Sequence, residues 1–582
     1  SGIYLVPDSK RYYPFGSLAS QAIGFVSSDN EGLYGLEAQY NEELEGTAGL
    51  VVTEKNAYGE DVLYKYEQYY DAENGDSLVL TIDVNIQHYL EQALEDAVEK
   101  YDVSNGATGI VMNVKTGAIL AMASLPNYDL NDPRTIYDEN LAAQLDGLEG
   151  DAYQEKLGEL QLLQWRNKAI NDTYEPGSTF KILTLAMALE EGLIDESSTF
   201  NCAGHINVEG WPKPMYCSKR AGHGQQTLAQ AVANSCNPAF IQIGLKVGTD
   251  KFYQYVSDFG LLDTTGIDLQ GEGKGIFFDE EEFGKNVVSL ASAAFGQTFN
   301  VTPIALITAE AAAVNGGYLY EPYLVQQVLD SDGNVVYEHD STPVRQVISE
   351  ETSERVCALL EGVVDGGTGK NAYVAGYRIG GKTGTADKTG TKTEDNPQGD
   401  IVVSFVGVAP IDDPEVIILI ALDTPSRTTG TYPSGGNMAA PTAGNLFAQI
   451  LPYLGIEPSY SAEEMASADT NVPNCIGLSL EEAKQKLGES GFSYRVEGDG
   501  ETVTDQTPVG GSIVPGTAEI ILYMGVEKSD EKCVVPNVVG LTAEAANERL
   551  TNAGLIMKVT GDTSSSSGSI RVTSQSAAEG SE

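Results

Sequence analysis

The stretch YEPGSTFKILTLAMALEEG, residues 174–192, contains the first candidate catalytic residues, Ser178 and Lys181. A Pro-Gly pair interrupts the chain, and an apolar run with helical spacing follows it. Residues three apart share one face of a helix, so Lys181 can reach the Oγ atom of Ser178. The positive end of the helix dipole and the apolar neighbours both disfavour an ammonium group. The placement therefore predicts a serine nucleophile activated by a neutral lysine.

Two further motifs support this prediction. Ser235 and Asn237 form an S-x-N motif after a predicted helix, and 382–385 reads Lys-Thr-Gly-Thr on a predicted strand. Either motif, or the S-x-x-K pair, is weak alone, because a chain of this length contains chance matches. Such matches lie at 28–30, 115–117, 388–390 and 529–532. Order and context separate the three motifs that matter: the serine comes first, then S-x-N after a helix, then K-T-G on a strand.

Composition limits the class of protein. The chain has 582 residues, of which 41% are hydrophobic and 20% charged, as expected for a globular protein of several domains. Its 84 acidic residues against 34 Lys and Arg give a net charge of −50. Such a surface repels phosphate backbones, so nucleic acid is not an expected partner. No apolar run of about 18 residues occurs, so the sequence predicts no membrane span.

The pattern of apolar residues predicts an α+β core. A strand and an amphipathic helix, with Ile86, Leu90 and Leu94 on one face, precede a hairpin at 108–124. A helix-rich stretch covers about 138–315, and strands return at about 377–423. We therefore expect one sheet built from both ends of the domain. Residues 1–78 show short β-like runs and little helical periodicity, which predicts a separate β-rich region.

The C-terminal region contains an internal repeat. Residues 472–498 and 535–561 align without a gap, with eleven identities over 27 positions. Each copy starts with Val-Pro-Asn and continues as a short amphipathic helix and a β run. We expect two small αβ domains, at 471–526 and 534–582, with the second cut short.

Together these motifs resemble the class B penicillin-binding proteins, the monofunctional D,D-transpeptidases of peptidoglycan synthesis. The stretches that carry the resemblance include GLYGLEAQYNEELEGTAG, WRNKAINDTYEPGSTFK and FGQTFNVTPIALITAEAAAVNGG. The resemblance implies a multidomain α+β chain: an N-terminal pedestal at 1–78 and a transpeptidase domain at 79–460. That domain would have the fold of penicillin-binding proteins and serine β-lactamases, and the two repeats would be PASTA-like domains.

The resemblance also implies a role for each motif residue. Ser178 would attack the penultimate D-Ala carbonyl of a stem peptide, with Lys181 as its base. Ser235 would relay the proton to the leaving D-Ala, and Asn237 would hold the substrate amide. Lys382 would supply positive charge. Thr383, Gly384 and Thr385 would bind the terminal carboxylate, and the backbone N–H groups of residues 178 and 385 would form the oxyanion hole. This chemistry requires no cofactor.

Two alternatives to transpeptidation stay open. A D,D-carboxypeptidase or β-lactamase on the same fold would pass the acyl group to water. Glu272 lies about where a deacylating acid would be expected, but no E-x-x-L-N box surrounds it. A non-catalytic sensor that binds muropeptides through the repeats is the other alternative. The presence of every catalytic residue argues against it.

The expected partners also follow from the resemblance. They are peptidoglycan stem peptides, β-lactams, a membrane glycosyltransferase and proteins of division or sporulation. The chain begins with Ser-Gly, and we expect an extracytoplasmic protein of a Gram-positive bacterium, anchored through an N-terminal segment absent here.

A cysteine and histidine cluster around the S-x-N motif predicts a possible metal site. If Ser235 and Asn237 face the cleft, Cys236 points behind it. There it could join Cys202, Cys217 and His223, a Cys₃His set that suits tetrahedral zinc. The spacing matches no standard zinc-finger signature. A Cys202–Cys217 disulfide and unlinked buried thiols are the two alternatives.

Overall fold

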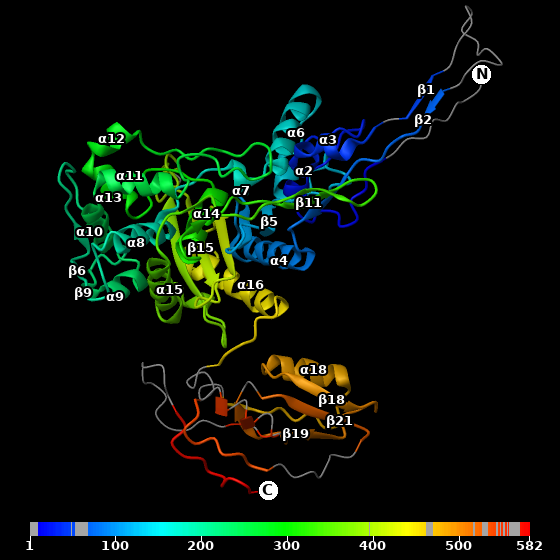
Figure 1. The fold of residues 1–582 in the computed structure, drawn as a ribbon, viewed down its shortest axis with the longest axis vertical. Coiled ribbons are helices and arrows are strands. Elements are labelled where there is room, and N and C mark those ends of the chain that lie inside the picture. The colour runs from blue at the N-terminus through cyan, green and yellow to red at the C-terminus, as the bar shows by residue number, and fades with distance from the viewer. Residues whose placement is uncertain are drawn as a thin grey trace, which may run out of the picture. The chain divides into compact units, whose positions relative to one another are not determined.

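The computed structural model describes residues 10–47, 49–52, 68–394, 396–460, 469–515, 518–526 and 534–581, the last range with gaps at 543–544, 547–548, 551–552, 554, 556 and 558–570. The chain divides into two compact units (Figure 1). The larger unit comprises residues 1–374 and 378–455, and the smaller comprises 375–377 and 456–582.

The larger unit is built on a five-stranded antiparallel sheet in the order β14-β15-β16-β4-β5. Its strands are β4 (Ala107–Asn113), β5 (Ile119–Leu125), β14 (Gly380–Asp387), β15 (Ile401–Ala409) and β16 (Val416–Asp423). The predicted hairpin is β4–β5. The two ends of the domain meet where Val416 of β16 lies opposite Asn113 of β4. The prediction of one sheet made from both ends is therefore confirmed.

Helices cover both faces of this sheet, which explains why β4, β15 and β16 are almost continuously apolar (Figure 1). On one face, α4 (Val84–Tyr101) packs against α16 (Ala440–Tyr453). Gly109 faces α4, since a Cβ atom there would lie 2.5 Å from Leu90 Cδ1. The next residue, Ile110, points the other way, into the large core that contains α8 (Lys181–Glu190) and α14 (Pro303–Val314).

The predicted helix-rich stretch forms the rest of that core. Its helices are α5 (Glu139–Ala142), η1 (Ala143–Leu145), α6 (Gly150–Trp165), α7 (Lys168–Asn171), η2 (Gly177–Phe180), α9 (Leu228–Ala233), α10 (Asn237–Val247), α11 (Thr249–Asp258), α12 (Glu280–Gly284) and α13 (Val287–Ala293). Two short strand pairs interrupt it: β6 (Thr199–Cys202) with β9 (Gly224–Thr227), and β7 (His205–Ile206) with β8 (Met215–Tyr216). Later elements are α15 (Glu350–Asp365), η3 (Lys370–Ala372) and η4 (Gly435–Ala439).

The N-terminal region contains helices that the sequence pattern did not indicate. They are α1 (Ser20–Ile23), α2 (Gly35–Gln39) and α3 (Asn41–Glu45). Each is about one turn long, too short to show a 3.6-residue period. The strands expected there are β1 (Leu50–Val52) paired with β2 (Gln68–Tyr70), and β3 (Ser77–Leu80). β3 pairs with β11 (Val325–Leu329), which also pairs with β12 (Val335–Glu338), and β10 (Tyr318–Leu319) pairs with β13 (Arg345–Gln346).

The first repeat forms the best-described part of the smaller unit. Ser479 and Glu482 make a capping box at the start of α18 (Leu480–Glu489), and Ala483 and Leu487 are fully buried, as their spacing predicts. β18 (Tyr494–Gly498) runs parallel to β21 (Ile520–Met524), which pairs antiparallel with β19 (Asp505–Thr507). β17 (Asp469–Asn471) pairs with β20 (Ile513–Pro515). Across all the described residues, we find no helix with the length and hydropathy that a bilayer crossing requires.

Candidate active site

Ser178 and Lys181 lie at the junction of η2 and α8. Residues 177–180 form a 3₁₀ turn, and α8 continues from it at Lys181. Side chains three apart are eclipsed in a 3₁₀ helix, so the two residues share a face. Lys181 is fully buried, whereas Ser178 is partly exposed. The local structure therefore agrees with the predicted pairing, with one difference in the lysine's contacts.

The Lys181 amine nitrogen contacts the S-x-N motif. Its Nζ atom lies 2.8 Å from Ser235 O, 3.1 Å from Ser235 Oγ and 2.7 Å from Asn237 Oδ1. Among the described residues, no hydrogen bond joins Lys181 Nζ to Ser178 Oγ. Catalytic hydrogen bonds are often long before substrate binds, and the shared helical face keeps the lysine beside the serine.

The S-x-N motif lies in a tight turn between α9 and α10. Ser235 has a φ of 50°, in the left-handed region that a residue with a side chain seldom adopts. Strain of this kind is common where a residue is held for function. The turn directs Ser235 and Asn237 toward Lys181 and leaves Cys236 fully buried. The prediction that Cys236 points away from the cleft, unlike Ser235 and Asn237, is therefore confirmed.

Lys382 of β14 reaches the same hydroxyl. Its Nζ atom donates to Ser235 Oγ at 2.8 Å and to Thr383 O at 3.1 Å, and its side chain is 1% exposed. Burial lowers the pKa of Lys181 to about 7. Burial, and then repulsion by Lys181, also holds the pKa of Lys382 well below its usual range. The arrangement disfavours two adjacent charges, so it favours a neutral amine in the site.

The rest of the K-T-G-T segment is held by neighbours. Thr383 Oγ1 donates to Thr368 Oγ1 at 3.1 Å, and Thr385 Oγ1 accepts from the Gly435 N–H at 3.3 Å. A Cβ atom at Gly384 would lie 2.3 Å from Ser404 Oγ, so a larger residue there would displace the Ser404 side chain. Thr385 is exposed, while Thr383 is 8% exposed. Carboxylate binding by these residues stays a prediction.

Close backbone approach places the nucleophile beside β14. Gly177 has a φ of 57°, and a Cβ atom there would lie 3.0 Å from Thr385 O. The Gly177 N–H donates to Gly296 O at 2.9 Å. A Cβ atom on Gly296 would lie only 1.9 Å from Gly177 O. Only glycine allows this contact. The two backbone segments proposed for the oxyanion hole, at 178 and 385, are thus adjacent, although their N–H directions stay a prediction.

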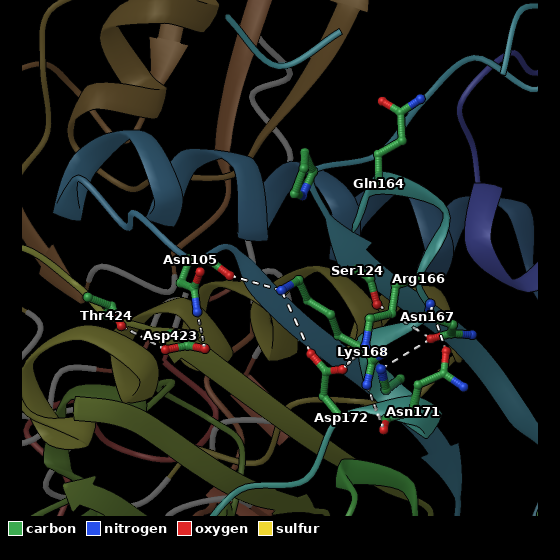
Figure 2. A network of polar contacts seen from close by, with 12 residues as sticks. Asn105, Ser124, Gln164, Arg166, Asn167, Lys168, Asn171, Asp172, Asp423 and Thr424 are labelled. Carbon is green, nitrogen blue, oxygen red and sulfur yellow. Dashed lines mark hydrogen bonds and ion pairs between the residues drawn. The ribbon is translucent and has the colours of Figure 1, made fainter. Parts of the chain in front are cut away.

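A polar network anchors the segment that leads to Ser178 (Figure 2). Lys168 Nζ donates to Asn105 O at 3.0 Å, and Asn105 Nδ2 donates to Asp423 Oδ2 at 2.9 Å. Arg166 pairs with Asp172. The network ties α7, which precedes Ser178 in the chain, to the ends of β4 and β16. The sequence interpretation did not identify these residues, because they come from three distant segments.

Glu310 is a buried acid that the sequence interpretation also missed. It is fully buried in α14, and neither carboxyl oxygen has a hydrogen-bond partner among the described residues. Burial holds the pKa of Glu310 well above its usual range, and nearby Lys382 opposes this shift. A single acid in the otherwise apolar run PIALITAEAAAV was the available signal. Burial therefore favours the protonated, neutral form of Glu310, next to Lys382.

The predicted Cys₃His set is brought together. The ligand atoms of Cys202, Cys217, His223 and Cys236 all lie within 4.8 Å of one another. The β6–β9 pair places Cys202 opposite Gly224, beside His223. The Cys217 sulfur lies 3.6 Å from His223 Nδ1, and a hydrogen bond from Cys236 lowers the pKa of Cys217. The three cysteines are unlinked, so the structure contains no Cys202–Cys217 disulfide.

Two lysines of the chance matches form ion pairs, and Glu272, the candidate deacylating acid of a β-lactamase, contacts backbone N–H groups. Lys115, in the β4–β5 turn, pairs with Asp413, and Lys388 pairs with Asp423. Glu272 accepts from the N–H groups of Thr265 and Gly266, so it closes a turn. Residues 529–532 lie outside the described residues.

Comparisons with known proteins agree with this site. Residues 107–450 match the penicillin binding protein transpeptidase domain, 1–80 match the penicillin-binding protein dimerisation domain, and 470–526 and 534–582 match the PASTA domain.

Similar proteins include stage V sporulation protein D of Bacillus subtilis, 39% identical over 91% of this chain and 78% of the relative. Peptidoglycan D,D-transpeptidase FtsI of Escherichia coli is 28% identical over 78% of this chain and 69% of the relative. The crystal structure of penicillin binding protein 3 from Mycobacterium tuberculosis, complexed with aztreonam, has a TM-score of 0.63 at 26% identity. It covers 77% of this chain and 91% of that one. The chain therefore belongs to the class B penicillin-binding proteins, serine D,D-transpeptidases with an N-terminal dimerisation domain and C-terminal PASTA domains.

Proposed function

We propose that this protein cross-links peptidoglycan stem peptides through an acyl-enzyme on Ser178, and that β-lactams acylate the same oxygen. The observation that carries the proposal is the convergence of Lys181 and Lys382 on Ser235 Oγ. Two buried amines around one hydroxyl provide a path for protons, as the activation of a serine requires.

The reaction has two steps. Neutral Lys181 takes the Ser178 proton as Oγ attacks the penultimate D-Ala carbonyl carbon. The amide C–N bond breaks, and the proton passes through Ser235 to the departing D-Ala nitrogen. In the second step, an acceptor amine attacks the acyl carbon and loses a proton, and Ser178 Oγ leaves and regains its hydrogen. Backbone N–H groups at 178 and 385 are the proposed donors to the oxyanion in both steps.

A direct assay separates transpeptidation from hydrolysis. The protein is incubated with a pentapeptide ending in D-Ala-D-Ala and with an acceptor peptide that carries a free side-chain amine. We expect release of D-Ala together with a new peptide–peptide amide, both blocked by penicillin. Release of D-Ala with only the hydrolysed tetrapeptide would instead indicate a carboxypeptidase. Rapid hydrolysis of penicillin would indicate a β-lactamase.

We also propose that Cys202, Cys217, His223 and Cys236 hold a structural zinc ion. Three thiolates and one imidazole form a preferred ligand set, and bond lengths of about 2.0–2.3 Å would require the four atoms to lie about 3.5–3.8 Å apart. The observed cluster, within 4.8 Å, needs only a small contraction. Because Cys236 lies between Ser235 and Asn237, the ion would brace the S-x-N turn from behind. Elemental analysis of protein purified without chelator should find one zinc per chain; well under one zinc per chain would overturn this proposal.

We further propose an extracytoplasmic location at a bacterial membrane, with a glycosyltransferase and proteins of division or sporulation as partners. The support is the name of one relative, stage V sporulation protein D, and the action of the family on peptidoglycan. Cross-linking in cells, followed by identification of captured proteins, tests it: a glycosyltransferase should be recovered.

A further inference from the structure

The β7–β8 hairpin differs in charge from the rest of this acidic protein. Residues 205–223 contain three cations, Lys213, Lys219 and Arg220, against the single acid Glu209, whereas the whole chain has a net charge of −50. All three cations are exposed. None of the ion pairs between described residues involves them, although acidic residues are abundant in the chain. The hairpin is therefore a local positive surface with its charges available.

This surface reaches the catalytic cleft through one hydrogen bond. Asn237 Nδ2 donates to Tyr216 O at 3.2 Å, while Asn237 Oδ1 accepts from Lys181 Nζ at 2.7 Å. The asparagine proposed to hold the substrate amide is thus fixed between the catalytic lysine and the hairpin. Tyr216 is consequently at the edge of the cleft, on the Asn237 side.

Arg220 is held in place on this edge. Its guanidinium carbon lies 3.9 Å from the centre of the Tyr216 ring, and that tyrosine is 49% exposed. A stacked guanidinium loses little freedom on binding and keeps its N–H groups in a planar fork that fits a carboxylate. In the described part of the chain, no side-chain hydrogen bond occupies that fork. The pair therefore offers an oriented anion-binding group beside Asn237.

We propose that Arg220, stacked on Tyr216, is a specificity-determining residue that binds a carboxylate of the donor peptide on the N-terminal side of the acylated D-Ala. The proposal rests on the proposed function, in which the K-T-G-T segment takes the terminal carboxylate and Asn237 takes the preceding amide. A second carboxylate upstream of that amide would reach Arg220. Lys213 and Lys219 would raise the local concentration of such anionic peptides.

Three penicillins provide matched probes. Carbenicillin adds a carboxylate to the side chain of benzylpenicillin, and ampicillin adds an amine at the same carbon. Second-order acylation rate constants are measured for all three. Arg220→Ala should lower the rate with carbenicillin by about fivefold, as expected for loss of a partly exposed ion pair, and leave benzylpenicillin unchanged. Ampicillin should gain slightly, and higher salt should reduce the carbenicillin effect.

Lys100→Ala is the matched control, because Lys100 is also an exposed cation over a tyrosine ring, 5.2 Å from Tyr101, but on α4. It should leave all three rates unchanged. Arg220→Gln, which keeps a long polar side chain without the charge, repeats the test if the alanine variant folds poorly. An equal change with benzylpenicillin and carbenicillin, or no change with either, would overturn the proposal. Failure of the unmodified protein to react with any of the three would instead overturn the proposed function.

Discussion

Lys382 Nζ lies 2.8 Å from Ser235 Oγ, although 147 positions separate the two residues. The contact joins the edge strand of the sheet to the turn before α10. Since Lys181 contacts the same oxygen from α8, three elements meet on one hydroxyl. Their meeting places Ser235 at the centre of the proposed proton path.

Lys181→Ala should slow penicillin acylation by about 10²–10⁴, the usual cost of losing a general base. Because burial lowers the pKa of Lys181 to about 7, its neutral, basic form increases as pH rises through 7. The acylation rate of the unmodified protein should therefore rise through this range and then level off. Lys181→Arg keeps the charge but cannot give up a proton, so it should be equally slow. A fast arginine variant would show that charge alone suffices.

Glu310→Met should stabilise the fold by about 1–3 kcal/mol, because it replaces a buried carboxyl group without hydrogen bonds by an apolar chain of similar length. Burial raises the pKa of Glu310 in the folded state, so unfolding above the ordinary pKa releases a proton. The wild-type protein thus loses stability as pH rises, and the gain from the substitution should be larger at pH 9 than at pH 6. Denaturant unfolding at the two pH values measures it. A destabilised variant would indicate a required hydrogen-bond partner of Glu310.

Cys202→Ser should remove the proposed zinc ion, because it replaces a thiolate by a poor ligand. Cys357→Ser is the matched control, since Cys357 is also buried but lies on α15 and outside the cluster. We expect the first variant alone to lose zinc and to have a lower melting temperature and acylation rate. Equal zinc content in the two variants would exclude Cys202 as a ligand.

A chain ending at residue 460 should be acylated by penicillin at the same rate as the full chain. All the motif residues, from Ser178 to Thr385, lie in the larger unit, which has its own core. A truncated protein with native circular dichroism but no penicillin labelling would show that the PASTA domains take part in the reaction.

Short sequence patterns predicted the helices and strands that depend mainly on neighbouring residues. The hairpin at 108–124 and the helix containing Leu90 follow from short-range alternation and helical spacing. The orientation of Cys236 followed from that of its two neighbours. The one-turn helices α1–α3 leave no such pattern, so they were not predicted.

Sequence patterns could not predict the contacts in the site between residues far apart in the chain. Nothing near Ser235 in the sequence indicates that Lys382 contacts it, or that Lys181 also contacts Ser235 and Asn237. Such details depend on how separate elements pack. The motifs identified which residues matter, and packing determined which atoms meet.

Mass spectrometry of the penicillin-treated protein can identify the residue that carries the acyl group. We predict a mass increase of one penicillin per chain, located by digestion on the peptide that contains Ser178. Ser178→Ala should abolish the adduct while leaving the melting temperature unchanged, because the hydroxyl makes no hydrogen bond to another described residue. An adduct on any other residue, or undiminished labelling of the Ser178→Ala protein, would contradict the account.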